Sequence, residues 1–181
     1  IGISIRSVDK NDVVPLGTVG EICSRGHCNM LGYNNNPDAT AAAIDDQGWL
    51  HTGDLGTMDS RGFVRVTGRV KEMIIRGGEN LFPVEIENTL LEHAAVAEVA
   101  VVGLPDEKWG EVVACFFRPE GGQKVDRQEL ASHCRNHLAP HKTPVIWVPV
   151  TEFPLTGSGK IRKFELVELY GSGKYDGLEL A

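Results

Sequence analysis

The sequence predicts an α/β (α+β) protein in which a short β-rich segment precedes a small α/β domain with a central three-stranded sheet and flanking helices. Two observations favour this class. Up to residue 67, short runs of alternating apolar and polar residues are separated by glycines, as in strands joined by tight turns. After residue 69, β-branched apolar runs alternate with helical patterns, which is typical of a compact α/β domain.

Composition and charge exclude several classes of protein. Of the 181 residues, 41% are hydrophobic and 24% are charged, which is sufficient for an ordinary folded core. The formal net charge of −7 argues against a nucleic-acid partner and against binding to an anionic membrane. The longest apolar runs, such as residues 99–104, have the length of a strand, so we expect no membrane span. Because the chain begins with Ile1 and its first residues resemble a strand, we expect it to be part of a longer polypeptide.

The first third of the chain contains the elements of the β-rich segment. Residues 1–9 and 18–25 alternate apolar and polar side chains, which predicts strands with one buried face. Pro37 opens a short helix, because proline is favoured at the first helical position. In residues 58–63 we expect a hairpin turn, since Gly62 is able to adopt a positive φ.

The rest of the chain predicts strands that alternate with helices. A short strand and a turn, at residues 73–75 and 77–80, precede a helix that starts at Pro83 and carries an apolar stripe. Asp126, with a glutamate three residues later, begins a capping box before a second helix. The three strands of the sheet, a last helix and a frayed tail complete the domain, at residues 96–102, 112–117, 145–150, 163–170 and 171–181.

The cysteines and histidines predict neither disulfides nor a metal centre. The four cysteines form no CxxC pair, so we expect free and mostly buried thiols. His133, Cys134 and His137, with His141 nearby, resemble a metal site. However, no glutamate follows His133, and no second pair of ligands lies elsewhere in the chain. Histidines that suit the dipole at a helix C-terminus explain this cluster more simply.

Two glycine-rich segments contain candidate ligand contacts near the junction of the two parts. Asp54, in residues 48–55, is able to accept hydrogen bonds from ligand hydroxyls such as a ribose diol, although an Asx-type turn is the simpler interpretation. Arg69 and Lys71 lie where the β-rich part ends, which suits either a hinge or ligand contacts. Gly77 and Gly78 allow a close approach of the backbone to a ligand or, more simply, a hairpin turn.

A third glycine-rich segment, residues 154–163, presents Lys160 in a Gly-Ser-Gly-Lys sequence that suits phosphate contact. It is not a P-loop, because Ile161 stands where serine or threonine is required. The same four letters recur at residues 171–174, so the pattern alone is weak.

Taken in order, these segments resemble the C-terminal part of the adenylate-forming superfamily, which comprises acyl- and aryl-CoA ligases, peptide synthetase adenylation domains and luciferases. A lysine rather than an aspartate at position 71 is more similar to acyl- or fatty-acid-CoA ligases than to peptide synthetase domains. The similar segments are a Leu-Gly-Tyr stretch, the Trp-x-x-Thr-Gly-Asp motif, the long hinge motif and the two segments that lead to the catalytic lysine, at residues 31–40, 48–55, 68–87, 138–144 and 154–160.

The resemblance implies an enzyme, an AMP-forming acid–thiol ligase. In the first half-reaction a carboxylate is joined to AMP and pyrophosphate leaves. In the second, the CoA thiol displaces AMP to give a thioester. The residues implied in these steps are the catalytic Lys160, the nucleotide-binding Asp54, Arg69 and Asn80, the hinge residue Lys71, and Gly77 and Gly78 at the CoA channel.

The resemblance also implies a domain organisation and partners. Residues 1–69 correspond to the β-rich end of a large adenylating domain, residues 70–170 to a mobile C-terminal domain and residues 171–181 to a flexible tail. The implied substrates are a carboxylic acid of the fatty type, ATP and CoA, with Mg²⁺ acting in the full-length enzyme but not bound by this chain. The N-terminal domain of the same polypeptide is the expected protein partner. A protein acetyltransferase acting on Lys160 is a further one.

We expect a cytoplasmic protein and an inactive isolated chain, and two alternative functions stay open. An aryl- or bile-acid-type CoA ligase is the close alternative, because the acid pocket, which alone distinguishes the acids, precedes residue 1 in this family. The alternative from another class is a binding or regulatory module that keeps the fold without catalysis. The presence of Asp54, Arg69 and Lys160 together argues against such a module, which has no need for all three.

Overall fold

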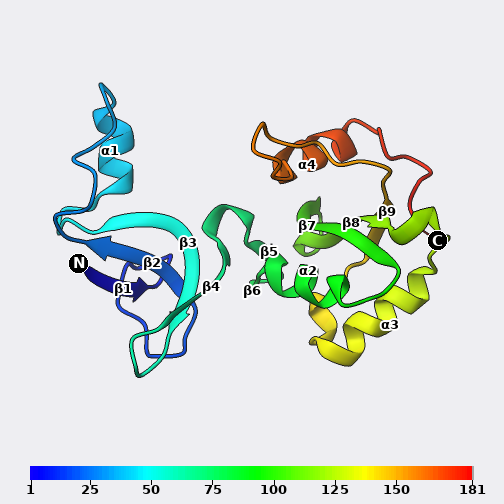
Figure 1. Ribbon diagram of the computed structural model, residues 1–181, viewed down its shortest axis with the longest axis horizontal. Helices are drawn as coiled ribbons and strands as arrows, with labels where there is room; N and C mark the ends of the chain where they lie inside the picture. Colours follow the sequence, from blue (N-terminus) through cyan, green and yellow to red (C-terminus); the bar gives the residue numbers. More distant parts are fainter. Residues whose placement is uncertain (181) are drawn as a thin grey trace. The chain divides into compact units, whose positions relative to one another are not determined.

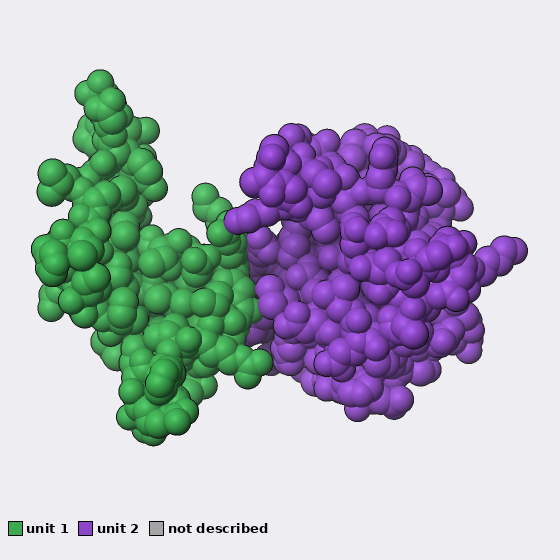
Figure 2. Space-filling model, in the orientation of Figure 1, with its two compact units in different colours: residues 1–71 green, residues 72–181 purple. Residues whose placement is uncertain are grey.

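The computed structural model describes residues 1–180, which form two compact units that divide between Lys71 and Glu72. Figure 1 follows the chain through both units, and Figure 2 shows each in its own colour. The division falls two residues beyond the boundary that the sequence suggests after residue 69. No helix among the described residues is long and apolar enough to span a membrane.

Unit 1 is a four-stranded antiparallel sheet with strand order β1-β2-β3-β4 and one short helix. Helix α1 (Pro37–Ala43) has Pro37 in its first turn, as predicted, and the Asn36 side chain accepts a hydrogen bond from the Ala39 N–H at its N-terminus. The predicted hairpin is confirmed, with Gly62 at φ 83° between β3 and β4. The strands are β1 (Gly2–Arg6), β2 (Gly20–Arg25), β3 (Leu50–Met58) and β4 (Val64–Arg69).

Unit 2 contains a five-stranded sheet around the central strand β8 (Gly110–Pro119). Strands β7 (Val96–Asp106) and β9 (Ile146–Pro149) pair with β8, in antiparallel and parallel directions, and supply the predicted three-stranded sheet. A hairpin of β5 (Ile74–Arg76) and β6 (Glu79–Leu81) adds two further strands, because Arg76 pairs with Gly110 at the start of β8. The sheet is therefore wider than the sequence predicted.

Apolar side chains cover both faces of this sheet. Along β8, Cys115 and Phe117 point into one buried cluster, and Ala114 and Phe116 into the other, as expected for a strand buried on both sides. Figure 1 shows helices α2 and α3 on one side and α4 on the other. The helices are α2 (Pro83–Leu91), α3 (Arg127–His137) and α4 (Lys163–Gly171), with 3₁₀ turns at Val70–Glu72, Glu120–Gly122 and Pro140–Lys142.

Two local expectations need correction. The Asp126 carboxylate caps α3 by accepting from the Gln128 N–H at 3.0 Å, and Glu129 instead lies 3.3 Å from His93, so the capping box is not formed.

The described part of the tail is packed rather than frayed: Tyr175 is buried, with its ring 5.2 Å from that of Phe116. One aromatic side chain provides this anchor without any helical periodicity, which is why the pattern did not predict it.

Candidate functional site

Asp54 and Arg69 lie directly opposite each other on β3 and β4. The Arg69 Nε–H donates to Asp54 Oδ1 at 3.1 Å, and the two side chains are 60% and 40% exposed. The structure therefore brings together the two residues that the sequence suggested as ribose contacts. A carboxylate beside a guanidinium offers both an acceptor and donors to a vicinal diol.

The strand that carries Asp54 contains a bulge. Between the pairs Glu21–Leu55 and Cys23–His51, β2 advances by two residues while β3 advances by four, which forms a bulge at the Thr-Gly-Asp segment. Gly53 sits in the bulge with φ 75°, a conformation that favours glycine. Glu21, which the sequence analysis did not single out, holds the bulge in place because its Oε1 accepts from the Gly53 N–H at 2.9 Å.

A buried polar network lies behind the bulge. His51 Nδ1 is 2.7 Å from Glu21 Oε2 and 3.6 Å from Cys23 Sγ, and His51 Nε2 is 3.8 Å from Asp45 Oδ2. Burial, and after it the negative charge of Glu21, raises the pKa of the Cys23 thiol to about 11. Burial alone would also raise the pKa of Asp45. Hydrogen bonds donated by the Trp49 N–H, the Asn11 side chain and the Gln47 N–H outweigh that effect and lower it.

Gly77 and Gly78 form the two-residue turn between β5 and β6, with φ 59° and 85°. This confirms the hairpin interpretation, since a positive φ at both positions is the pattern of a type I′ turn. Trp109 packs against the turn: its carbonyl accepts from the Gly77 N–H at 2.8 Å, and a Cβ on Gly77 would lie 2.9 Å from its ring. Arg76 and Lys108 lie over the same indole, at 5.2 and 4.8 Å. No local pattern predicted the role of Trp109, because it lies more than thirty residues after the turn in the chain.

Lys160 lies at the end of a closed turn rather than a flexible loop. Thr156 closes it, because its N–H donates to the Lys160 carbonyl at 2.8 Å and its Oγ1 accepts from the Lys160 N–H at 3.0 Å. Gly159 takes φ 81°, and Leu155 and Ile161 form a β-bridge below the turn. The Lys160 side chain is exposed, and within residues 1–180 its ammonium group takes part in no hydrogen bond or ion pair.

The next lysine along the chain, Lys163, has the opposite environment. Its ammonium group lies 2.8 Å from Glu72 and 2.7 Å from Glu87, and only 19% of its side chain is exposed. Lys163 is the first residue of α4, Glu72 directly follows Lys71 and Glu87 lies on α2. This cluster of three charges therefore ties the helix after Lys160 to the residue after the expected hinge.

The remaining candidates are at the surface. Lys71 is exposed in a 3₁₀ turn at the division between the units, and Asn80 is exposed on β6 opposite Ile75. In the histidine cluster, His133 Nε2 is 2.8 Å from the Thr89 carbonyl oxygen, and Cys134 lies in the hydrophobic core.

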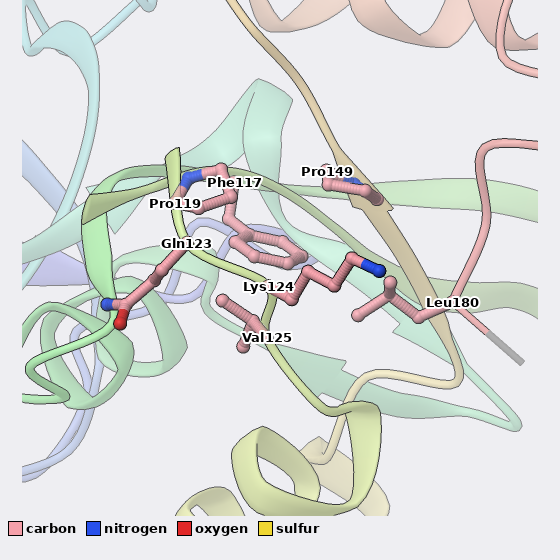
Figure 3. A pocket seen from close by; sticks show the side chains of 7 residues that line it. All are labelled: Phe117, Pro119, Gln123, Lys124, Val125, Pro149 and Leu180. Atoms are coloured by element: carbon pink, nitrogen blue, oxygen red, sulfur yellow. The ribbon is translucent and has the colours of Figure 1, made fainter. Parts of the chain in front are cut away.

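An open groove of about 360 Å³ lies elsewhere on unit 2. None of the candidate residues lines it (Figure 3). Its walls include Phe117, Val125 and Leu180, with Lys124 among the lining residues. We therefore assign this groove no part in the candidate site.

The family model for the AMP-binding enzyme C-terminal domain matches residues 85–160, which include α2, the central strands and the turn that presents Lys160. The chain belongs to the AMP-binding, adenylate-forming enzyme family. The fold agrees with this assignment, because solved members of the family superimpose on most of the chain.

Two relatives illustrate the similarity to other AMP-binding enzymes. The chain is 47% identical over 155 residues to the putative acyl-CoA synthetase YngI of Bacillus subtilis (strain 168), covering 86% of this chain and 28% of the relative. It is 42% identical over 164 residues to the human mitochondrial medium-chain acyl-CoA ligase ACSF2, covering 91% of this chain and 27% of the relative. The chain thus spans little more than a quarter of the length of these curated relatives.

Solved structures of AMP-binding enzymes give the same result. The o-succinylbenzoate CoA synthetase MenE of Bacillus subtilis, in complex with its acyl-adenylate intermediate, matches with a TM-score of 0.83 and 36% identity over 91% of this chain and 33% of that one. ATP-bound MatB from Rhodopseudomonas palustris matches with a TM-score of 0.88 and 31% identity over 93% of this chain and 34% of that one.

Proposed function

We propose that this chain is the C-terminal part of an AMP-forming acyl-CoA ligase that activates a carboxylic acid, of the fatty type, as acyl-AMP and transfers the acyl group to CoA. The observation that carries the proposal is the unengaged Lys160 ammonium group on a closed turn, in a chain that also keeps the Asp54–Arg69 pair. The relatives named acyl-CoA synthetase and medium-chain acyl-CoA ligase support the reaction and the fatty acid class.

In the first half-reaction, a carboxylate oxygen attacks the α-phosphorus of ATP and the bond to pyrophosphate breaks. Negative charge builds up on the α-phosphate and is shared with the attacking carboxylate. Lys160 is suited to stabilise that charge, because its backbone is fixed by Thr156 and its ammonium group has no competing partner among residues 1–180. Asp54 and Arg69 would hold the ribose hydroxyls, and Mg²⁺ would accompany ATP through groups outside this chain.

In the second half-reaction, the CoA thiol attacks the acyl carbon and AMP leaves. We assign the hinge between the two steps to Lys71 and the thiol channel to Gly77 and Gly78, with Asn80 as a phosphate contact. The turn at Gly77 and Gly78 supports the channel, because it presents backbone without side chains at the protein surface. We further propose a domain boundary at residues 69–71 and the N-terminal domain of the same polypeptide as the protein partner.

Replacing Lys160 by alanine in the full-length ligase tests the catalytic assignment. We expect acyl-AMP formation to fall by at least about 100-fold, as for other groups that stabilise developing charge, while thioester formation from preformed acyl-AMP persists. Lys174→Ala is a matched control, because Lys174 ends the second Gly-Ser-Gly-Lys sequence and is also exposed. Equal adenylation by both variants would favour the alternative of a non-catalytic module.

The substrate is tested by pyrophosphate release with a panel of acids. Medium-chain fatty acids are expected to be the best substrates, whereas preference for an aromatic or bile acid would establish the second type of ligase. With the 181-residue chain alone we expect no release above background, since residues outside it would bind the triphosphate.

Two regulatory and cellular assignments belong to the same proposal. We propose that a protein acetyltransferase modifies the exposed Lys160, which would remove its charge. Mass spectrometry of the native protein under excess acetyl donor is expected to find the modification, and an unmodified Lys160 would contradict it.

We place the enzyme in the cytoplasm. Fractionation tests this, with the mitochondrion as the alternative that ACSF2 suggests.

A further inference from the structure

Glu21, Cys23 and His51 bring three different metal-binding atoms together in unit 1. Glu21 and Cys23 lie two residues apart on β2, so their side chains point to the same face of the sheet, and Cys23 is directly opposite His51 on β3. One donor atom from each residue lies within 4.8 Å of the other two. The sequence did not predict this set, because His51 is distant in the chain and the pairing register alone unites it with Cys23.

The spacing of the donor atoms fits a tetrahedral zinc ion. With Zn–S of about 2.3 Å and Zn–N of about 2.0 Å, a sulfur and a nitrogen on one ion lie about 3.5 Å apart. His51 Nδ1 and Cys23 Sγ are 3.6 Å apart in the protein. The Glu21 oxygen lies 2.7 Å from Nδ1 and needs to retreat by roughly 0.6 Å to take the adjacent vertex. The other Glu21 oxygen keeps its bond to the Gly53 N–H.

The second ring nitrogen of His51 has a carboxylate nearby. His51 Nε2 lies 3.8 Å from Asp45 Oδ2, which is longer than a hydrogen bond, and a shift of less than about 1 Å would give the carboxylate–histidine arrangement that orients zinc ligands. Asp45 is itself fixed, because it accepts from the Trp49 N–H at 2.8 Å and from the Asn11 amide at 3.0 Å. The orienting group is therefore present before a metal arrives.

We propose that Glu21, Cys23 and His51 bind a Zn²⁺ ion, with water as the fourth ligand and Asp45 as the orienting carboxylate. On binding, the thiol proton of Cys23 leaves to solvent, and the imidazole proton moves from Nδ1 to Nε2, where it faces Asp45. The thiolate and imidazole select zinc over magnesium or calcium, which prefer oxygen ligands. Because Glu21 also holds Gly53, the ion fixes the bulge that carries Asp54. The site is separate from the groups assigned to the proposed ligase reaction.

Cobalt titration of the 181-residue chain tests the site without an activity assay. All measurements use a Cys28→Ser background, because Cys28 is the exposed cysteine of the same unit. We expect one Co²⁺ per chain, with a thiolate-to-metal charge-transfer band in the near ultraviolet and tetrahedral d–d bands, displaced by one Zn²⁺. Cys23→Ser abolishes the charge-transfer band. Asp45→Asn weakens affinity about 10- to 100-fold, and His27→Asn, at an exposed histidine, changes nothing.

Two results would overturn the proposal. The first is a Co²⁺ spectrum without the thiolate band in the parent protein, which needs no further variant and so does not depend on how well Cys23→Ser folds. The second is one-to-one binding that survives Cys23→Ser, with circular dichroism confirming that this variant is folded, since the ion would then lie elsewhere. Neither result bears on the ligase assignment, which rests on Lys160.

Discussion

Gly77 and Gly78 belong to one turn but differ in what surrounds them. Both have positive φ, which costs a residue with a side chain about 1 kcal/mol. Only Gly77 also has a neighbour in the way, the Trp109 ring at 2.9 Å from its would-be Cβ. The same turn therefore contains a test position and its own control.

We expect Gly78→Ala to lower the free energy of unfolding by about 1 kcal/mol and Gly77→Ala by about 2 kcal/mol. The extra loss arises because the indole of Trp109 has to move from its place beside Arg76. Urea denaturation measures both changes, and Trp109 fluorescence should shift in Gly77→Ala alone. Equal stabilities of the two variants would show that the ring yields without cost.

The sequence pattern predicted those residues whose structural role depends only on their own backbone conformation. Pro37 and Pro83 start helices, and Gly62 closes a hairpin, because each acts through its own backbone angles. The structural roles of Glu21 and Lys163 were not predicted, because their partners lie far away in the sequence. His51 is 30 residues from Glu21, and Glu72 is 91 residues from Lys163. Charge patterns carry no information about such pairs.

At the scale of elements, Lys163 is expected to stabilise the position of α4, because its ammonium group joins the start of this helix to Glu72 and to Glu87 on α2. Lys163→Met keeps the aliphatic stem but leaves Glu72 and Glu87 without their cation, so we expect a loss of about 1 to 3 kcal/mol. Arg118→Met is the control, because the Arg118–Glu98 pair is equally short at 2.7 Å but more exposed, and such surface pairs contribute at most about 1 kcal/mol. Equal losses in urea denaturation would contradict a special role for Lys163.

The turn that leads into β3 depends on an ionised Asp45. Its pKa is lower in the folded than in the unfolded chain, so the unfolded state binds protons first as the pH falls. The stabilisation is complete well above pH 3.8, the usual value of this carboxyl, and is lost as the pH falls through the lower folded value. The loss is confined to unit 1, which contains the groups that hydrogen-bond to Asp45.

We therefore expect Asp45→Asn to lower the thermal midpoint of unit 1 at pH 7, with the difference from the parent shrinking below about pH 4. Asp46→Asn provides the comparison, since this neighbouring carboxylate is exposed. Circular dichroism melts between pH 3 and pH 7 measure the effect. A difference that does not vary with pH would mean that the Asp45 side chain acts by its shape and not by its charge.

Element patterns predicted the central strands better than the edges of the sheet. The runs at β7 and β8 are buried on both faces, so burial alone marks them in the sequence. The β5–β6 hairpin is short and half exposed, and it joins the sheet through the single pair Arg76–Gly110. Such an attachment is decided by tertiary packing, which a local pattern does not contain.

At the scale of the whole molecule, the two units differ in how much apolar surface they bury. Unit 1 has four buried hydrophobic residues in 71, namely Ile5, Cys23, Trp49 and Leu55, whereas the described part of unit 2 has twenty-five. Both core clusters of unit 2 draw only on residues 74–180. Hydrophobic burial is the main force that offsets the loss of chain entropy on folding. We therefore infer that unit 2 is more stable as an isolated fragment than unit 1.

We predict that a fragment of residues 72–181 folds on its own and unfolds cooperatively, whereas a fragment of residues 1–71 is only marginally stable and unfolds at a much lower urea concentration. Unit 1 also leaves large apolar side chains at its surface, among them Leu31, Phe63 and Val66, so its sheet lacks the cover that a stable small domain requires. Circular dichroism and urea denaturation of each fragment test this. In the intact chain, trypsin should cleave unit 1 and leave a resistant fragment that begins near residue 72. A 1–71 fragment as stable as the 72–181 fragment would show that the four buried side chains, together with Arg6 and Arg25 at 4.6 and 4.5 Å from the Trp49 ring, suffice to hold the sheet together.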